Sequence, residues 1–73
     1  MRWQDYIVST PDTLHGAPRF RGTRIPVSVV LDNLAAGASA AELHQQYPTL
    51  PPEAVSAALA YAADLARDRI VPV

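Results

Sequence analysis

The chain has 73 residues and a formal net charge of −1, from six arginines, no lysine and seven acidic residues. Hydrophobic residues make up 49% of the chain and charged residues 18%, below the ~25% that is usual in soluble domains. A chain of this length holds one domain with one small core. The composition excludes a disordered tail, leaves apolar surface for a partner, and gives no overall basic field that would attract nucleic acid.

The sequence also bears on cellular location. It has no cysteine, which excludes a disulfide scaffold and a thiolate metal site. Residues 1–5 are not followed by the apolar region of a signal peptide. The longest apolar run, residues 57–63, is far shorter than the roughly 20 residues that cross a bilayer. We therefore expect a cytoplasmic protein without a membrane segment.

Residues 1–26 are expected to form a short β-ribbon with turns. Residues 6–9 are prone to form a strand, and residues 19–21 and 23–25 are extended pieces separated by Gly22, where a positive φ is favourable. The prolines at positions 18 and 26 lack an N–H group, which places these strands at an edge. Because a two-stranded ribbon is marginal in water, we expect it to pack on helices or on a second copy.

Residues 27–70 are expected to form three helices. The first is indicated by apolar residues at helical spacing, namely Val27, Val30, Leu31 and Leu34. Gly37 is a suitable left-handed residue for its end. Ser39 and Glu42 form the sequence pattern of a capping box, which predicts a second helix from Ala40 to about Tyr47.

The third helix is expected to open at Pro51-Pro52-Glu53 and to reach about Arg69, leaving a short tail at residues 71–73. Its outward face is predicted to carry Glu53, Ala57, Ala60 and Asp64. That face offers no Arg, Asn or Gln to base edges, which disfavours base reading by this helix. Its other apolar residues, including Leu59 and Leu65, are assigned to the packed side. The prediction is a mainly α, three-helix, helix-turn-helix-like domain over residues 1–73 with a short N-terminal β-ribbon.

No pattern of catalytic or metal-binding residues is present. His15 and His44 are far apart in sequence and have no ligand partner at helical spacing. The chain lacks a nucleophile elbow and a glycine-rich phosphate loop, and its aspartates are scattered. We therefore expect a protein that is not an enzyme and that uses no cofactor or metal.

Three arginines, Arg19, Arg21 and Arg24, lie within six residues around Gly22. One interpretation is a patch that contacts anions or an acidic partner. The other is structural: Arg24 would pair with a carboxylate such as Asp32 or Glu42 and fix the ribbon to the helices. The aromatic residues Trp3, Tyr6 and Phe20 are expected in the core or in a dimer contact.

Several spaced motifs run through most of the chain: Gly16-x-Pro18-Arg19-x-Arg21-Gly22-Thr23-Arg24-Ile25-Pro26-Val27, Gly37-x-Ser39-x-x-Glu42-Leu43, Tyr47-Pro48-x-Leu50 and Val55-x-x-Ala58-Leu59-x-Tyr61-Ala62. Over residues 5 to about 70 the chain resembles the bacterial family called domain of unknown function 433. The most specific string is Arg-Gly-Thr-Arg-Ile-Pro-Val at 21–27. The chain departs from the family at Pro51, where a Thr or Ser helix cap is common.

The resemblance implies a helix-turn-helix fold and a role like that of VapB-type antitoxins, often encoded beside a PIN-like ribonuclease toxin. The expected function is to bind and inhibit such a nuclease and to repress the chain's own operon, as a homodimer. Because a PIN-like site is a metal-binding carboxylate cluster, an inserted arginine could take the place of the cation. Candidate contacts are Arg67 and Arg69 near the C-terminal end, or Arg19 and Arg21 on the ribbon.

Two other classes of function stay open. The chain could be a stand-alone dimeric DNA-binding regulator, in which the ribbon arginines of two copies contact phosphates and binding falls steeply with salt. It could also be a structural adaptor with no nucleic-acid role.

Overall fold

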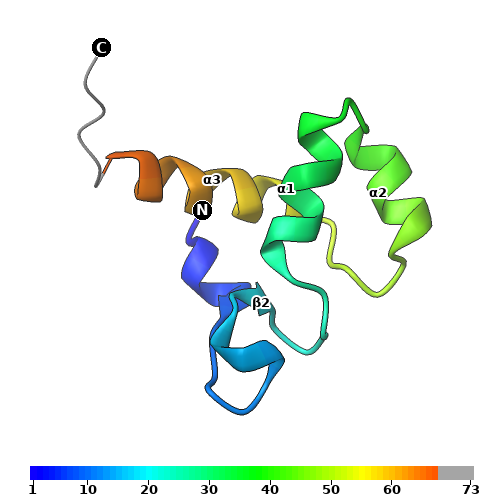
Figure 1. The fold of residues 1–73 in the computed structure, drawn as a ribbon. Coiled ribbons are helices and arrows are strands. Elements are labelled where there is room, and N and C mark those ends of the chain that lie inside the picture. The colour runs from blue at the N-terminus through cyan, green and yellow to red at the C-terminus, as the bar shows by residue number, and fades with distance from the viewer. Residues whose placement is uncertain (68–73) are drawn as a thin grey trace.

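The computed structural model describes residues 1–67. Its elements, in order, are the 3-10 helix η1 (Trp3–Asp5), strand β1 (Ile7–Val8), the 3-10 helix η2 (Leu14–Gly16), strand β2 (Arg19–Phe20), and helices α1 (Val27–Ala35), α2 (Ala40–Gln46) and α3 (Ala54–Arg67) (Figure 1). The predicted three-helix fold with an N-terminal β-ribbon is confirmed. Within residues 1–67, no helix is long and apolar enough to cross a membrane. Arg69 and the predicted tail lie outside the described residues.

The ribbon is formed by two successive pairings. Strands β1 and β2 are antiparallel, with Ile7 opposite Phe20. The chain then turns at Gly22, whose φ of 77° is in the left-handed region, and returns beside β2. The Phe20 N–H donates to the Ile25 carbonyl at 3.1 Å, and residues 19 and 26 form a further bridge. We call residues 18–27, which fold back on themselves here, the arginine hairpin.

Thr23 closes the turn of the arginine hairpin. Its hydroxyl donates to the Phe20 carbonyl at 2.8 Å and accepts from the Ile25 N–H at 3.1 Å. The Thr23 N–H also donates to the Phe20 carbonyl. One side chain therefore satisfies groups on both arms of the turn, which explains a Gly-Thr pair at this position.

The end of α1 has the geometry expected from the sequence. Gly37 has a φ of 100°, and its N–H donates to the Leu34 carbonyl at 3.0 Å. The Ala38 N–H donates to the Asn33 carbonyl at 2.9 Å. This pair of hydrogen bonds is the Schellman motif, which satisfies carbonyls that the helix itself leaves free.

The predicted capping box of α2 is also present. The Glu42 N–H donates to the Ser39 hydroxyl at 3.1 Å, and the Glu42 carboxylate accepts from the Ser39 N–H at 3.2 Å. Residues 36–39 connect α1 to α2, and residues 47–53 connect α2 to α3. The second connection is longer than the 3–4-residue turn typical of helix-turn-helix motifs.

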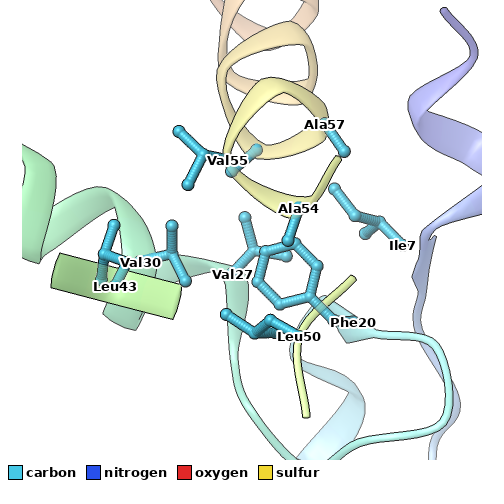
Figure 2. Close-up of a cluster of buried hydrophobic side chains, with 10 residues drawn as sticks. Ile7, Phe20, Val27, Val30, Leu43, Leu50, Ala54, Val55 and Ala57 are labelled. Atoms are coloured by element: carbon cyan, nitrogen blue, oxygen red, sulfur yellow. The ribbon is translucent and has the colours of Figure 1, made fainter. Parts of the chain in front are cut away.

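The core joins all three helices to the ribbon. Its buried side chains are Ile7, Phe20, Val27, Val30, Leu43, Leu50, Ala54, Val55, Ala57 and Ala58. Phe20 has no exposed surface, and Figure 2 shows its ring between Ala54 and Leu50. A strand of only two residues is therefore held in place by one aromatic side chain inserted among the helices.

Helix α3 differs from the sequence prediction in its orientation. Ala57, assigned to the outward face, has no exposed surface, whereas Leu59, assigned to the packed side, is 52% exposed. The reason is that α3 contacts two elements, α1 and η1, so its buried band lies where both reach it. Figure 2 shows Ala57 directed toward Ile7, next to the N-terminal segment. Helix α3 also starts at Ala54, just after the predicted opening.

Candidate partner-binding surface

Arg19 has a structural role in the ribbon. Its side chain is half-buried, and its Nη1 donates to the Thr23 carbonyl at 3.1 Å. Its Nη2 donates to the Thr10 hydroxyl at 3.3 Å, while its Nε is buried without a hydrogen-bond partner among residues 1–67. Arg19 thus ties the 9–18 loop to the turn of the arginine hairpin.

Arg21 connects the arginine hairpin to η1. Its Nε donates to the Asp5 carbonyl at 3.2 Å and its Nη2 to the Gln4 carbonyl at 3.5 Å. The side chain is exposed, and both acceptors are neutral backbone groups. The positive charge of Arg21 is therefore not neutralised by these contacts.

Arg24 does not form the ion pair expected from the sequence. It is exposed and has no carboxylate partner among residues 1–67. The carboxylate of Glu42 is used in its own capping box, and Asp32 lies exposed on α1. Since Thr23 already closes the turn, the fold does not need Arg24 for that purpose. Arg24 is consequently the hairpin arginine whose guanidinium has neither a hydrogen bond nor an ion pair among residues 1–67.

Arg67 is paired with its own helix. Its guanidinium forms an ion pair with Asp64, one turn earlier on α3. Asp64 also accepts a hydrogen bond from the indole Nε1 of Trp3 at 2.5 Å, and the Trp3 ring meets Tyr61 edge-on at a centroid distance of 5.0 Å. The hydrogen bond from Trp3, with help from Arg67, lowers the pKa of the Asp64 carboxyl below its ordinary value. The other predicted contact, Arg69, lies outside the described residues.

An open apolar groove lies between the start of α1 and the end of α3. Its volume is about 210 Å³, and it is lined by Ala17, Pro18, Val27, Ser28, Leu31, Tyr61 and Leu65. Leu65 is 45% exposed there, and Leu31, expected in the core, is half-buried. Sequence reasoning missed this groove because its walls come from three separated segments. The one available signal was an apolar stripe on α3 that extends past the core.

The described residues do not form a metal site. Within residues 1–67, no three His, Cys, Asp or Glu side chains lie close enough together to hold a metal ion. Those of the proposed contact arginines that the structure describes are not gathered into one cluster either. Arg19 and Arg21 bond within the ribbon and η1, whereas Arg67 is held on α3. Among the described residues, the apolar groove and the turn that carries Arg24 are two features that face solvent.

The fold and this surface define a small, mainly α-helical domain of three helices, with an arginine hairpin packed on its core. Residues 7–62 match the family described as "Protein of unknown function (DUF433)", and the chain belongs to this family. The string at 21–27, on which the resemblance to this family mainly depended, lies within the matched residues.

Two relatives show how far the similarity extends. The chain is 39% identical over 59 residues to the uncharacterized protein y4eO of Sinorhizobium fredii, a match that covers 81% of this chain and 27% of that protein. The crystal structure of a DUF433 member protein from Anabaena variabilis has a TM-score of 0.79 and 37% sequence identity, over 89% of this chain and 64% of that chain. This chain therefore spans about a quarter of the first relative and just under two thirds of the second.

Proposed function

We propose that this chain is the antitoxin-like member of a toxin–antitoxin pair, acting in the cytoplasm. In this function it binds and inhibits a PIN-like ribonuclease, and it represses its own operon. The proposal starts from the family resemblance, and the observation that carries it further is the exposed apolar surface of α3 and its groove. Leu59 is 52% exposed and Leu65 45% exposed, in a domain whose core is already complete without them.

The charge of the surface favours a protein partner over direct base reading. The net charge is −1, and the outward side of α3 carries Ser56, Leu59, Ala63 and Arg67, with Glu53 just before the helix. Of these side chains only Arg67 could recognise a base edge, and its guanidinium is held in an ion pair with Asp64. Apolar surface that is gathered in one place and rimmed by polar residues, as at the groove, is typical of protein interaction sites.

Co-expression with the product of the adjacent reading frame tests this proposal. The neighbour is purified through a tag, and metal-dependent RNA cleavage is measured with and without this chain. We expect the two proteins to purify together and cleavage to fall at least tenfold when they are at equal concentration. The same chain added to an unrelated ribonuclease, RNase A, serves as the control and should leave cleavage unchanged. Separate elution with full cleavage would reject the antitoxin function.

A stand-alone dimeric DNA-binding regulator is the second candidate. It is favoured by one observation: three hairpin arginines whose charges are not paired with a carboxylate among residues 1–67. Two copies would bring six such charges to the phosphates of one duplex. Binding of the upstream DNA should then fall with salt at a slope near −0.9 for each phosphate neutralised. Lack of binding at about 50 mM salt would exclude this candidate.

A further inference from the structure

The apolar groove and the arginine hairpin share one rim. The hairpin begins at Pro18 and ends at Val27, which both line the groove, and the Val27 N–H donates to the Pro18 carbonyl at 2.9 Å. Arg24 precedes Val27 by three residues, so their Cα atoms lie within about 11 Å of each other, since an extended residue spans at most ~3.6 Å. The hairpin whose base lines the groove therefore also carries, three residues from that base, an arginine with no ion pair among residues 1–67.

The two sides of this rim differ in charge. The arginine hairpin side carries Arg24, with Arg21 on the same turn. The α1 side carries Asp32, one helical turn after the groove residue Ser28, and Asp32 has no ion-pair partner among the described residues. The charge of the surface thus changes from positive at the hairpin to negative along α1.

The size of the groove limits what it can take. Its volume of about 210 Å³ is below the ~300 Å³ at which pockets for small molecules and cofactors begin. Its lining is apolar apart from Ser28 and the Tyr61 hydroxyl. An apolar side chain that projects from a protein segment fits these conditions better than a free ligand.

We propose that the groove and the arginine hairpin form one docking surface for an acidic, apolar segment of a protein partner. An apolar side chain of that segment enters the groove against Leu31 and Leu65, and an acidic side chain next to it pairs with Arg24. The acidic end lies at the hairpin, because Asp32 repels it from the α1 side. This proposal rests on the proposed function, because it takes the partner to be a protein. It places the contact at the hairpin rim and not at Arg67.

Nucleic acid fits the same surface less well. Phosphates could contact Arg21 and Arg24, but they offer nothing apolar to the groove, and Asp32 on α1 would repel them. A duplex that binds here should therefore affect the hairpin and leave the groove residues unchanged.

An NMR titration of the full chain tests the docking surface without the partner. The probes are two synthetic peptides, acetyl-Glu-Glu-Leu-Phe-amide and acetyl-Lys-Lys-Leu-Phe-amide. We expect the acidic peptide to shift the backbone amides of residues 17–31 and 61–65 and to bind at least tenfold more tightly than the basic one. Equal affinity for both peptides, or shifts confined to other regions, would overturn the proposal. A 20-base-pair duplex that shifts only the hairpin amides and binds more tightly than the acidic peptide would overturn it in favour of nucleic acid.

Matched variants locate the contact. Ser28→Trp fills the groove from an exposed position, and Ser56→Trp adds the same bulk to the outward side of α3 as its control. Arg24→Glu reverses the hairpin charge, and Arg2→Glu reverses that of another exposed arginine. Ser28→Trp and Arg24→Glu should each lower the affinity for the acidic peptide at least tenfold, and the two control variants should lower it less than twofold. Thermal unfolding of each variant confirms that the fold is retained.

The same variants separate this proposal from the proposed function. If the neighbouring nuclease is inhibited equally by the original chain, Ser28→Trp and Arg24→Glu, the antitoxin function holds and this docking surface is wrong. If the acidic peptide binds at the rim and the nuclease is not inhibited, the surface holds and the antitoxin function is wrong.

Discussion

The indole of Trp3 donates a hydrogen bond to the carboxylate of Asp64 at 2.5 Å, although the two residues are 61 positions apart. Trp3 lies in η1 and Asp64 near the end of α3, so one side chain fixes the N-terminal segment to the last turns of the helix. The edge-on contact of Trp3 with Tyr61 adds to this attachment. Because Tyr61 also lines the groove, the attachment supports one wall of the proposed docking surface.

Replacing Trp3 with alanine should loosen the end of α3. The variant loses both the hydrogen bond to Asp64 and the aromatic contact with Tyr61, and an aromatic pair of this kind contributes about 0.5–1.5 kcal/mol beyond its buried area. We expect the free energy of unfolding to fall by at least about 1 kcal/mol, measured by urea denaturation. Arg2→Ala, at an exposed neighbouring position, is the control. An unchanged urea midpoint for Trp3→Ala would show that η1 is not held in this way.

The stability of the protein should depend on Asp64 in acid. Its pKa is lowered in the folded state, first by the bond from Trp3 and then by Arg67, so the unfolded chain takes up the proton at a higher pH than the folded chain. The contribution is complete above the unfolded value of about 3.9 and is lost as the pH falls through the folded value. Asp64→Asn should therefore show a flatter decrease in unfolding free energy between about pH 5 and 2 than the original chain. Parallel curves over this range would contradict the assignment.

Phe20 and Leu31 should differ in their effect on stability. Phe20 is fully buried in the core, and its replacement by alanine should cost about 3–5 kcal/mol, enough to unfold most of a small domain. Leu31 is half-buried and lines the open groove, so Leu31→Ala should cost at most about 2 kcal/mol, the low end for leucine. Chemical denaturation monitored by circular dichroism gives both values. Equal costs would mean that the groove is closed in solution.

Gly22→Ala should destabilise the turn through backbone conformation alone. The φ of Gly22 is 77°, and a Cβ added there would meet nothing within 4 Å. A left-handed conformation costs an alanine about 1–2 kcal/mol, whereas asparagine tolerates it better. We expect Gly22→Asn to recover part of the stability lost in Gly22→Ala, as measured by thermal unfolding. A larger loss for asparagine would point to a steric conflict instead.

Local signals in the sequence predicted the framework of this fold well. Gly37 ends α1, the Ser39–Glu42 pair opens α2, and the extended pieces at 19–21 and 23–25 fold back at Gly22. Each of these signals depends on residues within a few positions of one another. Each signal depends on a helix cap or on the backbone conformation that a residue prefers, and the rest of the fold does not change these local preferences.

The orientation of α3 could not be predicted in the same way. Alanine is small enough for either a buried or an exposed position, so a helix rich in alanine has little apolar contrast between its faces. Ala57 is buried because η1 packs on that side, and η1 is more than fifty positions away in sequence. Leu59 is left exposed for the same reason.

The roles of the arginines were also beyond the sequence pattern. All three hairpin arginines, Arg19, Arg21 and Arg24, carry the same guanidinium group. Their structural roles differ according to the acceptors that each reaches, which are mostly backbone carbonyls. Arg19 bonds across its own hairpin and Arg21 reaches η1, contacts that depend on how the ribbon is folded. Within residues 1–67 Arg24 makes no such contact, which reverses the expectation that it would be the structural residue.

The Trp3–Asp64 hydrogen bond has a further consequence for how the domain connects to polypeptide on either side of it. Both residues lie just beyond the family match at 7–62, one before it and one after it. The bond holds the two borders of the shared domain side by side, as the position of the N-terminus next to α3 in Figure 1 shows. Polypeptide extending from either border would enter and leave at one place. In a longer chain, segments before Trp3 and after Asp64 would therefore start from neighbouring points on the domain.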